Sequence, residues 1–205
     1  SRADAKARQT DPDNTWLSHM PKRRLEGEAI RDAMLQAAGI LELERPIGSP
    51  AAFIEGGDRG PLIQRLDALQ SPVRSVYLPI IRDHLPEMLD VFDMAETTFV
   101  TGMREKTSVP TQALYMMNSD FVMAASGRMA DRLIEMPVSD NERIRVGFEL
   151  AYGRSPTQGE TTAVRSFLQD FPAAQGTRTV ATARKQGWTA FCQALFQGAE
   201  FRTID

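Results

Sequence analysis

The spacing of apolar residues constrains the fold of this chain more than any other feature. From Lys22 to Leu41, small and apolar residues recur every three to five positions, and charged residues take the opposite face of the expected helix. The last third of the chain repeats this pattern, and its Ser139–Glu142 segment matches a capping box that begins a helix. We expect Gly39 and Gly153 to end helices. The sequence therefore predicts a mostly α protein, an irregular helical bundle.

One segment favours extended backbone instead. Arg74–Leu78 combines Val76 and Tyr77 in a short run that Pro79 closes, and Ile80–Ile81 extends it. We expect at most a small β element near residues 74–81.

The length allows one sizeable core. A chain of 205 residues usually forms one domain. We therefore expect a single helical domain over residues 1–205, with a long Gly- and Pro-rich connector over residues 44–72 within it. Because Ser1 is not a methionine, we expect the chain to be a fragment of a larger polypeptide, whose signal peptide, if it has one, lies upstream.

Composition argues against several classes of function. The net charge of −3 gives no basic face for nucleic acid. No apolar run approaches the length of a membrane span. The single cysteine, Cys192, lies in an apolar helical run and reads as a core residue. One cysteine cannot form an intrachain disulfide or the haem attachment motif, so no cofactor is expected in this fragment.

The segment from Ser75 to Phe121 is the place where we expect a site. It mixes aromatic residues, prolines and charges without a long helical period. His84 is flanked by Arg82 and Asp83 and followed by Asp93, and an imidazole near a carboxylate can act as a base. These four residues are the catalytic candidates. A single histidine with scattered carboxylates is a poor zinc site, so no metal is expected.

A second set of polar residues in and near this segment could line a groove. These binding candidates are Arg74, Tyr77, Arg104, Thr111, Gln112 and Asn118. The competing interpretation is that the last three cap helices and satisfy backbone groups of an irregular segment.

Blocks of sequence in three regions of the chain carry a resemblance to a known family. They are RRLEGEAIRDAML (23–35), SVYLPIIRDHLPEMLDVFD (75–93) with SVPTQALYMMNSDFV (108–122), and RIRVGFELAYGRSPTQGE (143–160). In order and spacing they resemble the uncharacterised C-terminal domain of large planctomycete-type multidomain proteins that also carry a cytochrome-c-like module. That family usually has a basic and an amide-bearing residue after the Leu-Pro segment, and this chain departs from it at Asp83–His84.

The resemblance implies an exported or cell-envelope-associated polypeptide whose upstream domains are the partners of this one. It also implies a role connected either with complex polysaccharides or with electron transfer through the neighbouring cytochrome-c-like module.

Two functional hypotheses follow. In the first, the domain is not an enzyme but a structural or interaction module that packs on a neighbouring domain or partner through Ser75–Phe121. In the alternative, it is a carbohydrate-active enzyme or glycan-binding domain with a cleft around residues 74–93. A broad apolar surface would favour the first, and a pocket holding His84 and a carboxylate would favour the second.

Overall fold

The computed structural model describes residues 9–48, 71–80, 85–95, 97–174 and 179–204. Helices dominate these residues, which confirms the predicted mostly α fold. The α-helices are α2 (Gly27–Ala38), α4 (Glu87–Val91), α5 (Pro110–Asn118), α6 (Asp120–Glu135), α7 (Asp140–Tyr152), α8 (Gln158–Ala174) and α9 (Val180–Gln197). Most of the predicted connector, residues 49–70, lies outside the described residues.

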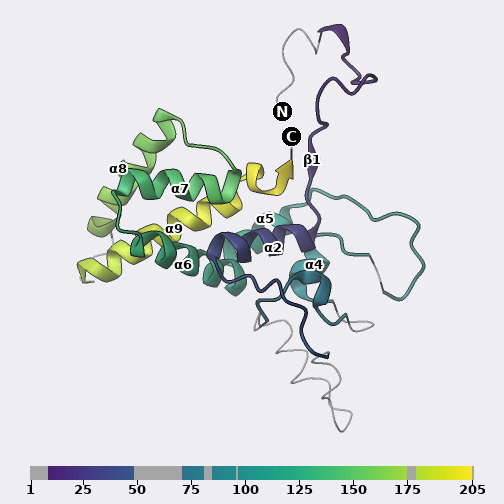
Figure 1. The fold of residues 1–205 in the computed structure, drawn as a ribbon, viewed down its shortest axis with the longest axis horizontal. Helices are drawn as coiled ribbons and strands as arrows, with labels where there is room; N and C mark the ends of the chain where they lie inside the picture. Colours follow the sequence, from purple (N-terminus) through teal and green to yellow (C-terminus); the bar gives the residue numbers. More distant parts are fainter. Residues whose placement is uncertain (1–8, 49–70, 81–84, 96, 175–178, 205) are drawn as a thin grey trace.

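Helices α6 and α9 form the centre of the bundle (Figure 1). Helix α2 packs against α6, and helix α8 packs against α9. Helix α7 contacts α2, α6, α8 and α9, while the short helices α4 and α5 extend the bundle beyond α2. The side with α7 and α8 is therefore compactly helical, whereas the side with α4 carries the irregular segments (Figure 1).

Capping side chains and glycines set several of the helix boundaries. The Ser139 hydroxyl accepts a hydrogen bond from the Glu142 backbone N–H at the start of α7, and Ser119 does the same for Phe121 at the start of α6. Gly39 and Gly153 end α2 and α7 with φ values of 75° and 67°, a left-handed conformation that glycine adopts without strain. The predicted start of α7 and the predicted ends of α2 and α7 are confirmed.

The core lies between α2, α6, α7 and α9. Its largest fully buried side chains include Trp188 and Phe196 of α9, Met34 of α2 and Met129 of α6. Burial of each such side chain contributes about 1.5–3 kcal/mol. Cys192 is completely buried among them, and this burial raises the pKa of its thiol. Cys192 is thus a core residue, as predicted.

The small β element is present but not where the sequence suggested. Strand β1 (Arg23–Arg24) pairs antiparallel with β2 (Thr203–Ile204), in the register Arg23 to Ile204 and Arg24 to Thr203. Residues Ser75–Tyr77 form instead the 3₁₀ helix η2, and only Val73 makes an isolated bridge, to Glu42. The prediction of extended backbone at 74–78 was wrong because two side chains of α2 hold this segment.

Arg31 and Asp32 of α2 are those side chains. The buried Arg31 guanidinium donates to the carbonyl oxygens of Val73 (2.9 Å) and Ser71 (2.7 Å). The Asp32 carboxylate accepts from the backbone N–H and the hydroxyl of Ser75, at 2.8 and 2.6 Å. These tertiary bonds replace the strand partners that an extended segment would need.

Candidate functional site

Asp93, one of the catalytic candidates, is the centre of a hydrogen-bond network. It follows α4 with a left-handed φ of 63°. Its carboxylate binds the Arg24 guanidinium at 2.5 Å and accepts from the Thr107 N–H and hydroxyl at 2.9 and 2.7 Å. Arg24 also donates to the Thr107 carbonyl oxygen at 2.6 Å. Asp93 therefore fastens residue 107 to β1.

The electrostatics of Asp93 favour an anchor over a proton donor. Burial alone would raise the pKa of this carboxyl, but the hydrogen bonds from Thr107 and the ion pair with Arg24 outweigh it, and the pKa lies below its ordinary value. This carboxylate is held ionised by its partners, so it is not poised as a general acid, which needs a raised pKa.

Of the predicted binding residues on α5, one joins this network. The Gln112 side chain is buried, and its amide donates to the Val91 carbonyl oxygen at 3.1 Å and lies 3.3 Å from the Thr107 hydroxyl. Thr111 is exposed. The exposed Asn118 amide donates to Leu114 within its own helix. Gln112 thus satisfies backbone groups, as the competing interpretation held, and the structure does not bring the three residues into one groove.

Arg104 forms a second clamp on the same loop. Its guanidinium makes two hydrogen bonds to the Glu28 carboxylate, at 2.7 and 3.0 Å, and one to Glu26 at 3.3 Å. Burial alone would raise the pKa of Glu28, but the hydrogen bond and charge of Arg104, together with a backbone hydrogen bond, outweigh it and the pKa is lowered. The loop from residue 97 to 108 is consequently tied to α2 at Arg104 and to Asp93 at Thr107.

A cleft of about 410 Å³ lies where the alternative hypothesis expected one. Arg74 and η2 form one wall, and α2 forms the other with the carboxylates of Glu26, Glu28 and Asp32. The Arg74 Nε lies 3.7 Å from the Asp32 carboxylate, and Tyr77 is half-buried in η2. The catalytic candidates Arg82, Asp83 and His84 lie outside the described residues.

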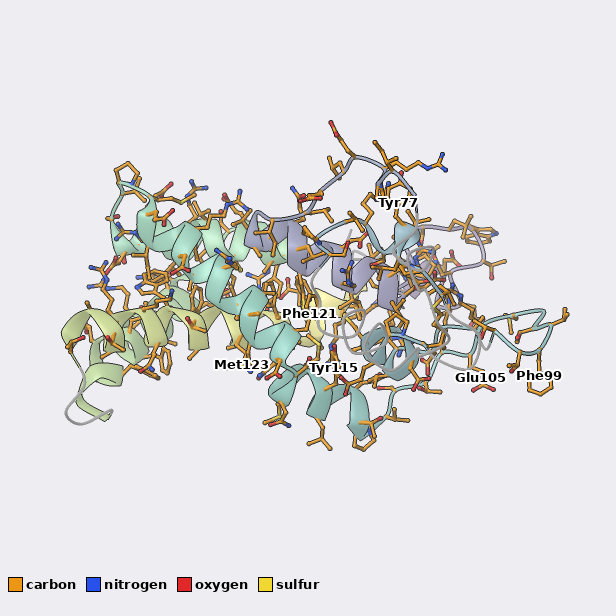
Figure 2. All side chains as sticks on the ribbon, turned by 90° about the horizontal axis from the view of Figure 1, so that it is seen from below. Tyr77, Phe99, Glu105, Tyr115, Phe121 and Met123 are labelled. Carbon is orange, nitrogen blue, oxygen red and sulfur yellow. The ribbon has the colours of Figure 1, made fainter. Side chains whose placement is uncertain are left out.

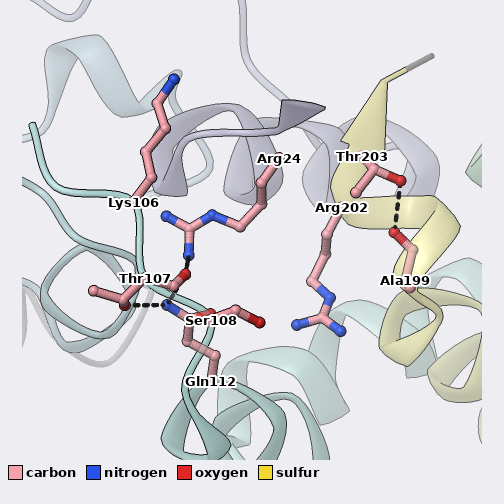
Figure 3. Close-up of a pocket in the computed structure, with 8 residues that line it drawn as sticks. All are labelled: Arg24, Lys106, Thr107, Ser108, Gln112, Ala199, Arg202 and Thr203. Atoms are coloured by element: carbon pink, nitrogen blue, oxygen red, sulfur yellow. Dashed lines mark hydrogen bonds between the residues drawn. The ribbon is translucent and has the colours of Figure 1, made fainter. Parts of the chain in front are cut away.

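A second pocket, of about 250 Å³, is lined by residues of β1, of the loop before α5, of the start of α5 and of the C-terminal segment (Figure 3). Its lining contains three cationic residues and no acidic one: Arg24, Lys106, Thr107, Ser108, Gln112, Ala199, Arg202 and Thr203. Figure 3 shows Arg24 turned toward Thr107 from the β1 side, while Arg202 enters from the opposite, C-terminal side.

Arg202 distinguishes this pocket from the rest of the molecule. Its Nε is buried and has no hydrogen-bond partner among the described residues, and the Nε of Arg24 is in the same state. Burial, together with the positive charge of Arg24, lowers the pKa of Arg202. Two guanidinium groups therefore share a partly dehydrated pocket without an acidic side chain in its lining.

Sequence reasoning missed Arg24 and Arg202. They are brought together by the pairing of two strands of two residues each, from opposite ends of the chain. Strands this short carry no alternating pattern, so no sequence signal pointed to the pair. Within the described residues there is also no cluster of three or more His, Cys, Asp or Glu side chains that could hold a metal ion.

Comparison with known protein families gives a match over most of the chain. The model described as "PSD1: Protein of unknown function (DUF1553)" matches residues 1–168. The chain belongs to the PSD1 family. The matched region includes Arg24, Asp93 and Gln112, and Arg202 follows it. No curated protein and no solved structure matched the chain. Among the described helices, none has both the length and the apolar character needed to cross a membrane.

Proposed function

We propose that this PSD1 domain is an interaction module that packs on a neighbouring domain of the same polypeptide. The observation that carries this proposal is the loop between α4 and α5, whose base is clamped while its outer part exposes large apolar side chains. Phe99, Val100 and Met103 are 77%, 105% and 84% exposed. Figure 2 shows Phe99 at the outer end of this loop, directed away from the helices.

The contacts of Thr107 with Asp93 and of Arg104 with Glu28 fix the loop in a position that leaves its apolar side chains exposed. Two residues in the second half of the loop are held by the rest of the chain. Thr107 donates to Asp93, and Arg104 donates to Glu28. A loop that merely collapsed on the surface would bury its phenylalanine and methionine, since each gains free energy by leaving water. Contiguous exposed apolar side chains of this kind are typical of protein interfaces.

A second projecting segment has the same character. The Asp11 carboxylate accepts from the backbone N–H groups of Thr15 and Trp16 at 2.7 and 2.9 Å, and Asn14 binds the backbone of His19. These bonds fix a turn in which Trp16 and Leu17 are 73% and 76% exposed. The segment and the loop both leave the bundle on the side of β1 and α4 (Figure 1). A partner that covers this side would bury both.

The occupant we propose is the part of the polypeptide that precedes this domain. The N-terminal segment 9–22 runs away from the helices with its tryptophan exposed, as a chain would that continues along a neighbouring domain (Figure 1). The multidomain, planctomycete-type architecture with a cytochrome-c-like module, and the export of the polypeptide to the cell envelope, belong to this proposal and rest on the resemblance.

A glycan-binding or glycan-cleaving domain is the second candidate. The cleft beside Arg74, with three carboxylates on its α2 wall, is the observation that favours it. Two of these carboxylates are bound by Arg104, and Asp32 is bound by Ser75. Since they are occupied within the chain, the interaction module accounts for more of the structure.

The experiment measures binding between this domain and the preceding part of its polypeptide, expressed as a separate chain. Calorimetry compares the wild type with the pair Phe99→Ser and Val100→Ser. The matched control pair is Phe167→Ser and Val138→Ser, which removes the same two residue types from exposed positions elsewhere. We expect at least about tenfold weaker binding for the first pair and no change for the control. Equal effects of both pairs, or no binding by the wild type, would refute the proposal.

A further inference from the structure

We propose that the pocket between β1, η3 (Ala199–Arg202) and the start of α5 binds a tetrahedral oxyanion, a phosphate or sulfate group, through Arg202 and Arg24. Nothing in the interaction function requires this pocket, and the side chains that would touch the partner, Phe99, Val100 and Met103, do not line it. The inference begins from a like-charge pair that the fold keeps together.

The fold places Arg202 beside Arg24, and no acidic side chain in the described part of the chain pairs with it. Thr203, the next residue, pairs with Arg24 across the two strands, and the Arg202 carbonyl oxygen accepts from the Leu25 N–H at 2.8 Å. The backbone position of Arg202 is therefore fixed. Its side chain extends into the pocket, and no hydrogen bond or ion pair joins that side chain to another described residue (Figure 3).

Two acidic groups near this pocket, both among the described residues, are committed elsewhere. Asp93 binds Arg24 and Thr107. Glu200, two residues before Arg202, binds Arg154 through both carboxylate oxygens, at 2.6 and 2.8 Å. Arg202 thus keeps its charge in a partly dehydrated place although a carboxylate stands close to it in sequence.

The pocket offers the donors that an oxyanion needs. A partly buried guanidinium without a partner has a desolvation cost, and a bound anion offsets this cost with charge-assisted hydrogen bonds. The terminal nitrogens of Arg202 supply donors, Arg24 and Lys106 add positive charge, and the Ser108 side chain lies in the same lining. Arginine is the side chain best suited to phosphate and sulfate, because its planar fork matches two oxygens at once.

The lining also selects for the chemistry of the ligand. It combines three cations with hydroxyl and amide groups and contains no aromatic side chain on which a base or a sugar ring could stack. We therefore expect recognition of the oxyanion itself, whether it is a free ion or a group on a larger molecule.

The experiment is a thermal-unfolding titration of the whole chain with potassium phosphate, potassium sulfate, potassium acetate and potassium chloride at equal ionic strength. An anion that binds only the folded state raises Tm progressively with its concentration. We expect this rise with phosphate, sulfate or both, beyond the effect of chloride, and the stronger of the two identifies the group. A rise with acetate alone, or no rise beyond chloride, would overturn the assignment.

A matched pair of variants locates the effect. Arg202→Met keeps the aliphatic stem and removes the charge, and Arg128→Met makes the same change at an exposed position of α6. We expect at least about tenfold weaker anion binding for the first and no change for the second. Because Arg202→Met removes a like charge, it should fold at least as well as the wild type. An equal response of both variants would place the binding elsewhere and refute the site.

A spectroscopic readout completes the test. The side-chain Nε–H signals of arginines are visible in ¹⁵N-resolved NMR spectra, and those of Arg24 and Arg202 should shift on addition of phosphate while that of Arg128 stays unchanged. Shifts spread over the surface arginines, without a larger shift of Arg202, would contradict the proposal.

Discussion

Arg154 and Arg202 lie near the same C-terminal segment but have opposite surroundings. Arg154, just after α7, binds both Glu160 and Glu200 with distances of 2.6–3.0 Å, and its guanidinium lies over the rings of Phe148 and Tyr152. Arg202 faces another arginine. The hydrogen bonds that Arg154 donates to the two carboxylates raise the pKa of Arg154, whereas burial and the charge of Arg24 lower the pKa of Arg202.

The difference separates an arginine that completes a fold from one that needs an outside partner. Arg154 joins the α7–α8 corner to η3, and each of its partners is supplied by the chain. Arg202 has a backbone position fixed by hydrogen bonds, like a structural residue, but no counter-charge among the residues that the structure describes. A folded protein that retains an unpaired, partly buried cation gives up stability there, which is the usual signature of a binding function.

The largest expected effect on stability comes from removing the carboxylate of Asp93, which pairs with Arg24. Asparagine tolerates the left-handed φ of residue 93, so Asp93→Asn removes the charge while keeping the backbone. We expect a loss of about 2 kcal/mol in the free energy of unfolding, because Arg24 and Thr107 lose a charged acceptor. Urea denaturation at pH 7 measures it. The anion-induced rise in Tm should increase in this variant, since two cations then lack partners.

The pH dependence checks the sign of that effect. The folded-state pKa of Asp93 is lowered, so its contribution is complete above the unfolded-state value of about 3.9 and disappears as pH falls through the folded-state value. The difference between wild type and Asp93→Asn should therefore shrink only below about pH 4. A difference that persists unchanged at lower pH would show that the charge is not its cause.

Removing the paired arginine should destabilise the fold by a smaller amount. Arg154→Met leaves Glu160 and Glu200 without their common partner and opens the stack on Phe148. We expect a loss of about 1–2 kcal/mol, because the site is partly exposed to solvent and water replaces part of the interaction. Arg165→Met, an exposed position on α8, is the control for unfolding measurements. If Arg154→Met and Arg165→Met had the same free energy of unfolding, the contrast between Arg154 and Arg202 would be contradicted.

Sequence reasoning succeeded where structure is local. The helices around Ile30, Phe121 and Ile144 follow from periodicity and from caps such as Ser139, all of which act within a few residues. It failed at Ser75–Tyr77, because the bonds that shape this segment come from Arg31 and Asp32, more than forty positions away. Arg31 was placed on the polar face of its helix, and only the tertiary fold buries it.

The candidate site shows the same limit more strongly. Sequence pattern located Asp93 and Gln112 in an irregular polar segment, and the structure joins them in one network. It could not foresee that Asp93 is saturated by Arg24 and Thr107. Nor could it see Arg202, whose role depends on a pairing between residues at opposite ends of the chain and on the absence of an acid in the lining.

A carboxylate introduced into the pocket should make Arg202 resemble Arg154. Ser108 lines the pocket from the loop that precedes α5, and Ser108→Asp adds an acid to a lining that has none. We expect a gain of about 0.5–1 kcal/mol in the free energy of unfolding and loss of the phosphate- or sulfate-induced rise in Tm. Ser155→Asp, beside the already paired Arg154, is the control and should bring no gain. Unchanged anion binding in Ser108→Asp would mean that the pocket is not the site.

The smallest expected effect on stability comes from neutralising Glu160, one of the two carboxylates that pair with Arg154. The hydrogen bonds from Arg154 hold the pKa of Glu160 at about 2, and Glu160 also accepts from the Thr157 N–H at the start of α8. A lowered folded-state pKa contributes stability that is complete above the unfolded-state value of about 4.3 and is lost as pH falls toward 2. Glu160→Gln should thus cost about 0.5 kcal/mol at neutral pH, after allowance for solvent screening, and this cost should vanish near pH 2. Chemical denaturation across this range, with Glu135→Gln at an exposed end of α6 as control, measures it. If the cost of Glu160→Gln did not depend on pH, the pairing of Arg154 would be a matter of packing, and charge alone would no longer separate the two arginines.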